Sequence, residues 1–342
     1  MPTQRKSAKG QSAYKATGLP TTIVETDRRI PLIVLAVIAL IMAVVLLFTQ
    51  CSGPAASPAS SSVPAIGEPA VEGGSSASSD AVEQVDPPSN PAAKASLEEY
   101  TWEELSQISA KIADAATDDD AIYVAKQYGF VNASGRIDGS AAKSVALGDG
   151  TNVSVRIIGF NHDSASDGSG KAGITFMFTD GIMPMAYNED GSNLGGWPSS
   201  SVSSALYTNV FSQLPADLTE RIVEVSKPSN TGAVDSVTES NDVIWLPSYV
   251  ELVGSVDSSM GDIAATLQKE GSQYQLFKDS GVAATGGNSV LVMHDGGQAG
   301  SWWLRSADAG TADSWCYVDA TGHPDKGGAA NQQYLVVPCF CL

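Results

Sequence analysis

The sequence predicts an α+β fold for the C-terminal part of the chain, preceded by one transmembrane helix and a disordered stalk. Three observations predict this fold class. Helical periodicity is concentrated at the start of that part, alternating strand-like segments cluster towards its end, and irregular glycine-rich links join them. A doubly wound parallel sheet would alternate strands and helices throughout. We therefore divide the chain into a cytoplasmic basic segment (1–29), a transmembrane helix (30–48), a disordered stalk (49–95), a helical segment (96–145) and an α+β extracellular domain (146–342).

The first 48 residues predict a membrane anchor. Residues 1–29 carry six Lys and Arg against two acidic residues, and Ile30–Phe48 contains no charged residue. About 19 helical residues just cross a hydrocarbon core of roughly 30 Å. A signal peptide usually has a shorter apolar region and a small-residue cleavage site, which the following FTQCSG does not provide. The positive flank predicts a cytoplasmic N terminus and an extracellular C-terminal domain.

Residues 49–95 predict a disordered stalk. They consist mainly of Ser, Ala, Pro and Gly, so they lack the apolar surface that would offset the entropy of ordering. Beyond residue 29 the chain carries 13 Lys and Arg against 36 Asp and Glu, a net charge of −23 that the +4 of the N-terminal segment brings to −19. So acidic a surface argues against nucleic acid and anionic lipid as partners.

Two helices are predicted at the start of the folded part. Thr101 and Glu104 fit a capping box. Asp118, Asp119 and Asp120 favour the start of a second helix at about 121–128, because carboxylates stabilise helix N-termini. Three successive carboxylates point in different directions on a helix, so helix starting is preferred to cation binding. The apolar positions of the first helix share one face: Leu105, Ile108, Ile112 and Ala115.

A glycine-rich segment lies between two predicted strands. The first strand covers 152–160, with a bulge at Ile157 and Ile158, and the second begins at Gly173 in GITFMF. Between them, DGSGKAG contains the G-x-G-x-x-G spacing of dinucleotide-binding loops. Such a loop leads directly into a helix, whose N terminus binds the phosphate. Here a strand follows, so we interpret DGSGKAG as a connection between strands.

Helices and strands follow in the remaining chain in an order typical of an α+β fold. A proline in the first turn favours a helix from Pro198 to about Phe211. PADLTERI predicts a short helix and IVEVS a strand, and DVIWLPSYVEL predicts a strand followed by a helical turn that begins at Ser248. Closing strands are predicted in SWWLRSA, WCYVDATG and YLVVPCFCL.

The candidate binding residues are Trp302, Trp303 and Arg305, together with Trp197. On a strand, Trp303 and Arg305 face one side, and an aromatic ring beside a guanidinium can hold a sugar or a carboxylate. The alternative is a core-edge arginine that stacks on tryptophan and donates to backbone carbonyls. No catalytic residue is predicted, because no Ser/His/Asp, Cys/His or paired-carboxylate set has an interpretable spacing.

The chain has four cysteines, Cys51, Cys316, Cys339 and Cys341. Cys339 and Cys341 lie two apart on a predicted strand and share a face, so they are poorly placed to bond each other. Either can form a disulfide with Cys316 outside a cell, and buried free thiols are the alternative. The sequence does not decide the fate of Cys51 at the membrane edge.

Metal ligands are not predicted from the histidines. His162–Asp163 and His294–Asp295 form two His-Asp pairs in glycine-rich loops, and neither these nor His323 has a metal-ligand spacing. Ordinary loop hydrogen bonds are therefore expected. No cofactor is predicted. Calcium is considered because a short turn offers three oxygen ligands, and a solvated turn is the preferred alternative. These ligands would be Asn188, Asp190 and Asn193.

Several motifs resemble a domain of unknown function carried by surface and secreted proteins of anaerobic Gram-positive bacteria. They are GFNHD, GKAGITF, GGW, LP-x-D-L, WLPSYVEL, SWWLRSA and the terminal P-x-F-x-L. The resemblance covers about Thr101 to Leu342 and implies a bacterial cell surface, without an activity. The closing G-S-W…R motif, Gly300 to Arg305, is more faintly similar to the C-type-lectin-like fold of formylglycine-generating enzymes.

We therefore expect a membrane-anchored, single-pass cell-surface protein whose outer domain is a non-catalytic binding module. Its expected partners are the membrane, through residues 30–48, and a cell-wall glycan or a surface protein. One alternative is an enzyme on a lectin-like fold that uses Cys339 or Cys341, which the fainter resemblance implies. Another is a structural spacer domain that binds no ligand.

Overall fold

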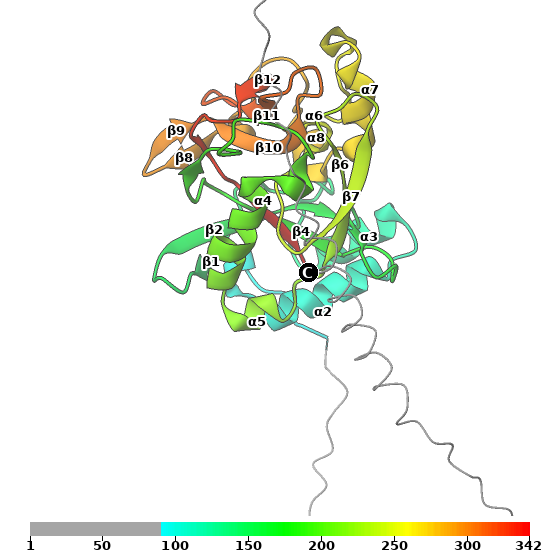
Figure 1. The fold of residues 1–342 in the computed structure, drawn as a ribbon. Helices are drawn as coiled ribbons and strands as arrows, with labels where there is room; N and C mark the ends of the chain where they lie inside the picture. The colour runs from blue at the N-terminus through cyan, green and yellow to red at the C-terminus, as the bar shows by residue number, and fades with distance from the viewer. Residues whose placement is uncertain (1–89) are drawn as a thin grey trace, which may run out of the picture. The chain divides into compact units, whose positions relative to one another are not determined.

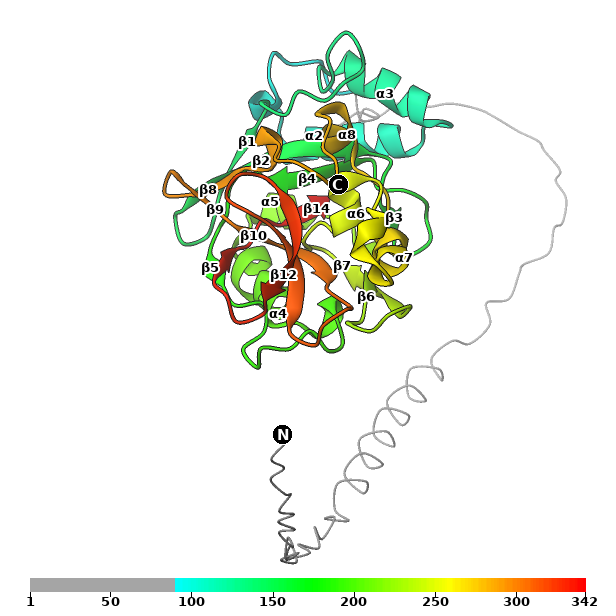
Figure 2. The same ribbon diagram turned by 90° about the horizontal axis from the view of Figure 1, so that it is seen from above.

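Strands distant in sequence lie side by side in the C-terminal domain, seen in a computed structural model of the chain (Figures 1 and 2). The structure describes residues 90–342. The predicted transmembrane span at 30–48 and most of the predicted stalk lie outside these residues. Within residues 90–342, no helix is long and apolar enough to cross a membrane.

Two helices begin the domain, as predicted. α2 (Trp102–Ala113) has the predicted capping box: the Thr101 side chain accepts from the Glu104 N–H, and the Glu104 carboxylate accepts from the Thr101 N–H. α3 (Asp118–Gln127) begins at its acidic turn rather than at about 121, because the three carboxylates meet the positive end of the helix dipole. The predicted inward face of α2 is fully buried at Leu105, Ile108 and Ile112.

A four-stranded antiparallel sheet lies against α2. Its bulge in β2 occurs where predicted, since the register against β4 shifts between Ile157 and Gly159. All residues of β4 are buried rather than alternating, because α2 covers one face, where Trp102 meets Phe176 edge-on, and the rest of the domain covers the other. The sheet order is β1 (Lys143–Ala146), β2 (Asn152–Phe160), β4 (Ile174–Phe178) and β14 (Cys339–Cys341).

A five-stranded sheet lies at the opposite end of the domain in Figure 1. β10 and β13 pair in parallel, whereas the other neighbours are antiparallel. The sheet order is β12 (Pro324–Ala329), β11 (Ser314–Val318), β10 (Trp302–Ala307), β13 (Tyr334–Leu335) and β5 (Pro184–Met185). There are two smaller sheets among the described residues. One contains β3 (Ser164–Ala165), β6 (Val225–Asn230) and β7 (Val237–Asp242), and the other contains β8 (Met293–Asp295) and β9 (Gln298–Gly300).

The helix predicted from Pro198 to Phe211 is divided into short helices of different kinds. They are η2 (Trp197–Ser199), α4 (Ser201–Ala205), a π-helix η3 (Leu206–Val210) and η4 (Phe211–Gln213). The serine-rich sequence has modest helix propensity, which favours such irregularity. The remaining helices are η1 (Leu97–Glu99), α5 (Ala216–Thr219), α6 (Tyr249–Val253), η5 (Ser258–Met260), α7 (Ile263–Leu267), η6 (Gln268–Glu270), α8 (Gln275–Asp279) and η7 (Ser289–Leu291).

One hydrophobic core joins the predicted helical segment, residues 96–145, to the sheets. α6 begins at Ser248, as predicted, with a second capping box to Glu251. The strand predicted just before it is reduced to one bridge between Trp245 and Cys339. Helices and mainly antiparallel sheets together confirm the α+β prediction for the C-terminal part.

Candidate functional site

The predicted binding residues Trp302, Trp303, Arg305 and Trp197 all lie in the interior, with no exposed surface. The indole N–H of Trp302 donates to the Leu291 carbonyl at 2.8 Å, and several backbone carbonyls surround Arg305. The structure therefore forms no open platform at these residues, because β10, which carries Trp302, Trp303 and Arg305, is buried on both faces, and Trp197 is buried at the start of η2. The alternative interpretation, an arginine bonded to backbone carbonyls, describes the geometry.

Arg305 instead belongs to a cluster of buried charged side chains, which we call the buried charge network: Asp163, Lys227, Glu251, Glu270 and Arg305. The Lys227 ammonium lies 2.5 Å from an Asp163 oxygen and 2.6 Å from a Glu251 oxygen. The other Glu251 oxygen lies 2.9 Å from the Arg305 guanidinium. Negative and positive groups thus alternate from Asp163 to Arg305, so these four charges balance, as buried charges require.

The charged state of the network follows from its contacts. Burial alone would raise the pKa of Asp163, but Lys227 and His162 hold it well below its usual range. Burial likewise opposes ionisation of Glu251, yet Arg305 and Lys227 lower its pKa. Burial lowers the pKa of Lys227, but its two carboxylate partners raise it above the usual value. The network is therefore ionised from Asp163 to Arg305 at neutral pH.

Glu270 is the exception in the network. Burial raises the pKa of its carboxyl, and this effect exceeds the opposing attraction of Arg305. One carboxyl oxygen accepts from the Asn230 backbone N–H at 2.7 Å, and the other accepts from the Ser306 hydroxyl. These hydrogen bonds satisfy the buried carboxyl without a full counter-charge.

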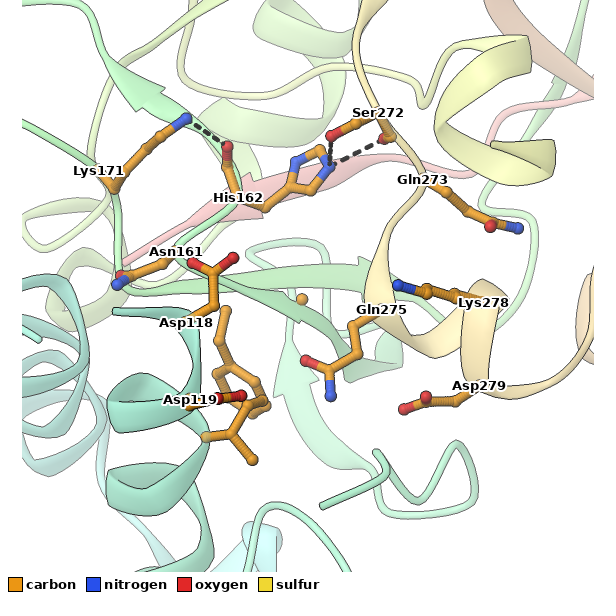
Figure 3. Close-up of a pocket in the computed structure, with 13 residues that line it drawn as sticks. Asp118, Asp119, Asn161, His162, Lys171, Ser272, Gln273, Gln275, Lys278 and Asp279 are labelled. Carbon is orange, nitrogen blue, oxygen red and sulfur yellow. Dashed lines mark hydrogen bonds between the residues drawn. The ribbon is translucent and has the colours of Figure 1, made fainter. Parts of the chain in front are cut away.

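A pocket of about 480 Å³ lies beside the network (Figure 3). It is lined by the start of α3, the end of β2 with the loop that follows, and the segment leading into α8. His162 connects the pocket with the network. Its Nδ1 lies 3.3 Å from Asp163 Oδ1. The centroid of its ring is 4.0 Å from the ring centroid of Tyr274, whose hydroxyl also donates to Asp163.

Ser272 holds the other side of the His162 ring. Nε2 lies 2.9 Å from the Ser272 carbonyl oxygen and 3.1 Å from the Ser272 hydroxyl. His162 thus makes the loop hydrogen bonds that the sequence predicts, and the ring is fixed in one orientation. The preceding Asn161 has a φ of 48°, a left-handed conformation that asparagine tolerates better than most residues. Its amide oxygen is buried and accepts no hydrogen bond from the described residues.

The side walls of the pocket carry charged groups of both signs. Asp118 and Asp119 project from α3 on one side, and Lys278 projects from α8 on the other, as Figure 3 shows. Asp279 adds a third carboxylate, which accepts from the Ile137 N–H at 3.1 Å. A ligand with both a cationic and an anionic or carbonyl group fits such walls.

Lys171 also lines this pocket. Its ammonium donates to the His162 carbonyl at 2.9 Å and to the Ser164 hydroxyl at 3.1 Å. These bonds close the DGSGKAG loop, which connects two strands as predicted, although the first is the unpredicted β3 rather than β2. Gly168 and Gly170 supply the positive φ angles of 75° and 134° that the turn requires. The loop leads into a strand, so it lacks the helix N-terminus of a phosphate-binding loop.

The predicted disulfide from Cys316 to Cys339 or Cys341 is not formed, because Cys339 and Cys341 are both free thiols. Cys316 lies in β11 of the five-stranded sheet, whereas the other two lie in β14 of the four-stranded sheet. Burial raises the pKa of the Cys339 and Cys341 thiols well above the usual value, which disfavours the reactive thiolate. Cys51 lies outside the described residues.

Two of the three residues considered for calcium accept hydrogen bonds through their side-chain oxygens, whereas the Asn193 side-chain oxygen is buried and accepts none from the described residues. The Asn188 side-chain oxygen accepts from the Ser201 N–H at 2.7 Å, and Asp190 accepts from the Ser192 N–H at 2.9 Å. The Asn193 amide nitrogen donates to three backbone carbonyls, which fixes its orientation. Across residues 90–342, no three His, Cys, Asp or Glu residues are arranged to hold a metal ion.

Sequence reasoning missed most of this site, because its members come from separate segments. Two local signals point to it in retrospect. Lys227 occupies an inward position of strand VSKPSN, where its neighbours Val225 and Ser229 are buried. Glu251 interrupts the apolar run YVELV, so it must be buried with its neighbours. A charged residue at such a position needs a partner of opposite charge.

Comparison with known proteins identifies one family. Residues 173–342 match the family described as Domain of unknown function (DUF6273). This confirms the expected domain of unknown function, although the match begins at Gly173 rather than near Thr101. It includes every member of the buried charge network except Asp163. No curated protein and no solved structure shows significant similarity to the chain.

Proposed function

We propose that the chain is a single-pass surface protein whose outer domain is a non-catalytic binding module with its ligand in the His162 pocket. The apolar segment 30–48 and its basic flank support the anchor, and the low-complexity segment 49–95 supports the tether. The acidic composition beyond the anchor suits a soluble outer domain. The expected partner at the surface is a wall glycan or another surface protein.

The proposal for the ligand is carried by the two carboxylates on the α3 wall and the ammonium on the α8 wall, where Asp279 lies beside Lys278. Asp118 and Asp119 attract an ammonium group, and Lys278 on the facing wall attracts a carboxylate or a carbonyl oxygen. The fixed imidazole of His162 lies at the edge between them. A short peptide with a free amino end presents these groups within one small molecule. We therefore assign the pocket to that ligand class.

The test is calorimetric titration of the full chain, purified in detergent, with dialanine and with N-acetyl-dialanine. Acetylation removes the ammonium charge without changing the rest of the ligand. The proposal predicts that dialanine binds and that N-acetyl-dialanine binds at least about tenfold more weakly, a difference of about 1.4 kcal/mol. Equal binding of both peptides, or of neither, would contradict it.

A matched pair of variants locates the site. Asp118→Asn removes one wall charge and should weaken dialanine binding, since a charge-assisted hydrogen bond contributes about 1.5–3 kcal/mol. Asp235→Asn makes the same chemical change at a residue with 72% side-chain exposure, paired only with surface Lys269. It should leave binding unchanged. An equal loss in both variants would place the peptide elsewhere.

One observation favours a second candidate function, acyl transfer by Ser272. Its hydroxyl lies 3.1 Å from His162 Nε2, and His162 Nδ1 lies 3.3 Å from Asp163, the order of a serine hydrolase relay. The hydroxyl would attack an acyl carbonyl, His162 would pass its proton to the leaving group, and water would release the acyl group. Two contacts oppose this: the Ser272 carbonyl competes for Nε2, and Lys227 neutralises Asp163.

Labelling with a fluorophosphonate separates the two functions. The binding function predicts no covalent adduct on Ser272, whereas the relay predicts an adduct that disappears in Ser272→Ala. The alternative enzyme that uses Cys339 or Cys341 on a lectin-like fold has less support, because both thiols are buried. Absence of any ligand would favour the spacer domain. Release of the outer domain by protease added to intact cells would test the topology.

A further inference from the structure

A second pocket, of about 600 Å³, lies away from the His162 pocket, between the helices after Trp197 and the β6–β7 hairpin. Its volume is within the range of about 300–1,000 Å³ typical of small-molecule sites. One side is aromatic and the other carries carboxylates and an amide. We call it the hairpin pocket, and nothing in the proposed function uses it.

The aromatic side consists of Tyr207 and Phe211. Their rings are nearly parallel, with centroids 5.5 Å apart and an interplanar angle of 10°. Tyr207 is 59% exposed. It is one of four large apolar residues in residues 90–342 that are exposed to solvent. The two stacked rings form one apolar aromatic surface at the pocket edge, which we call the aromatic strip.

A π-helix presents this strip. η3 (Leu206–Val210) closes with a hydrogen bond from the Phe211 N–H to the Leu206 carbonyl. π-helical turns are rare and occur frequently at functional sites, where they change the direction of side chains. Val210 and Leu206 are buried in the core, so the turn is anchored from behind while Tyr207 faces solvent. The exposed ring is therefore held on a fixed backbone.

The polar side comes from the open end of the β6–β7 hairpin. The register pairs Val225 with Asp242 and Ser226 with Asn241, so Glu224, directly before Val225, lies at the same end of the hairpin. All three of these polar side chains line the hairpin pocket. The hairpin thus supplies two carboxylates and an amide opposite the aromatic strip.

Asp242 is held in place by the interior. The indole N–H of Trp197 lies 3.2 Å from both of its oxygens, and the Ser240 hydroxyl donates at 2.6 Å. Each carboxylate oxygen has more than one lone pair, so Asp242 can accept further hydrogen bonds from a ligand. Trp197, a candidate binding residue from the sequence, therefore acts as a positioning residue for this pocket.

From this arrangement, we propose that the hairpin pocket binds a neutral oligosaccharide, with a sugar ring stacked on Tyr207 and its hydroxyls donating to Asp242, Asn241 or Glu224. A pyranose has an apolar C–H face and a rim of hydroxyl groups, which match the aromatic strip and the acceptors. The two carboxylates repel uronic acids, so the sugar is neutral. This adds a site to the binding module and rests on the proposed function only for its place at the cell surface.

The experiment titrates the full chain in detergent with chitopentaose, cellopentaose and an oligogalacturonate of the same length. Saturable binding of at least one neutral sugar at millimolar concentration is expected, with no binding of the anionic one. Tyr207→Ala should weaken binding at least about tenfold. Asp242→Asn should also weaken it, because the amide replaces an acceptor oxygen with a donor.

The matched control is Tyr123→Ala. Tyr123 is 65% exposed on α3 and lies outside the hairpin pocket. The Tyr123→Ala variant should therefore bind sugar as the unchanged protein does. Binding of none of the neutral sugars, equal loss in both tyrosine variants, or equal binding of the oligogalacturonate would each overturn the proposal. A change of oligomeric state in Tyr207→Ala without sugar binding would overturn it in favour of a protein contact. Dialanine binding is measured separately, so failure of either site is distinguishable.

Discussion

Replacing Lys227 by methionine tests the buried charge network most severely. The ammonium lies between Asp163 and Glu251, at 2.5 and 2.6 Å, and all three side chains are at most 2% exposed. Methionine has a similar length but no charge, so two buried carboxylates would lose their shared counter-ion. Breaking a buried pair by removing one partner destabilises proteins by about 3–5 kcal/mol. We expect Lys227→Met to lose that much stability.

The measurement is urea unfolding followed by tryptophan fluorescence, since all six tryptophans lie in the C-terminal part. In a thermal scan of the same variant, at about 2–4 °C per kcal/mol for a domain of this size, the melting temperature should fall by about 6–20 °C. Lys269→Met is the control, because its pair with Asp235 spans 3.6 Å at the surface. Exposed pairs contribute about 0–1 kcal/mol. Equal losses in the two variants would refute the network's role.

The pH dependence gives the variant a distinct signature. In the unchanged protein, the pKa values of Asp163 and Glu251 are lower in the folded state than in the unfolded state. The stability that this adds is present at pH values above the unfolded-state pKa, and it is lost as the pH falls through the folded-state pKa. Without Lys227, burial is opposed less and the pKa of Asp163 should rise most, because Arg305 still lies 2.9 Å from Glu251. Lys227→Met should therefore lose less stability, relative to the unchanged protein, at pH 5 than at pH 7. A pH-independent difference would contradict this.

Three further predictions concern other buried groups. The raised pKa of Glu270 means that stability falls as pH rises above the usual glutamate range, and Glu270→Gln should remove this fall in urea titrations between pH 4.5 and 8. Gly173→Ala would place a Cβ 1.9 Å from the Ser109 carbonyl oxygen and should lose at least about 1–3 kcal/mol, seen as a lower urea midpoint. Iodoacetamide should modify Cys339 and Cys341 only in denaturant, as mapped by mass spectrometry.

Local signals in the sequence predict much of the fold. Thr101 and Ser248 start helices because their side chains cap backbone N–H groups within three residues. The β2 bulge is visible as Ile157 and Ile158 in succession, which breaks the alternation of the strand. Each of these features depends on neighbours in the chain. Such features can be predicted without knowing the tertiary structure.

The sites depend on contacts between distant segments and were mostly not predictable. Trp303 and Arg305 have the residue types of a binding platform, but no local pattern shows that both faces of their strand are covered. The choice between a Cys316 disulfide and buried thiols stays open in the sequence for a related reason, since strand spacing does not tell which sheet a strand joins. His162 was noticed as a loop histidine, but Ser272 comes to it from a segment far along the chain.

The imidazole signals of the three histidines show directly whether dialanine binds in the His162 pocket. The chain has only three histidines, His162, His294 and His323, so nuclear magnetic resonance of the full chain should resolve three imidazole groups. His162→Gln assigns the pocket signal, and the other two serve as internal controls outside the pocket. Our account predicts that dialanine shifts the His162 signal saturably and leaves the other two unchanged. No shift at His162, or equal shifts at all three, would contradict it.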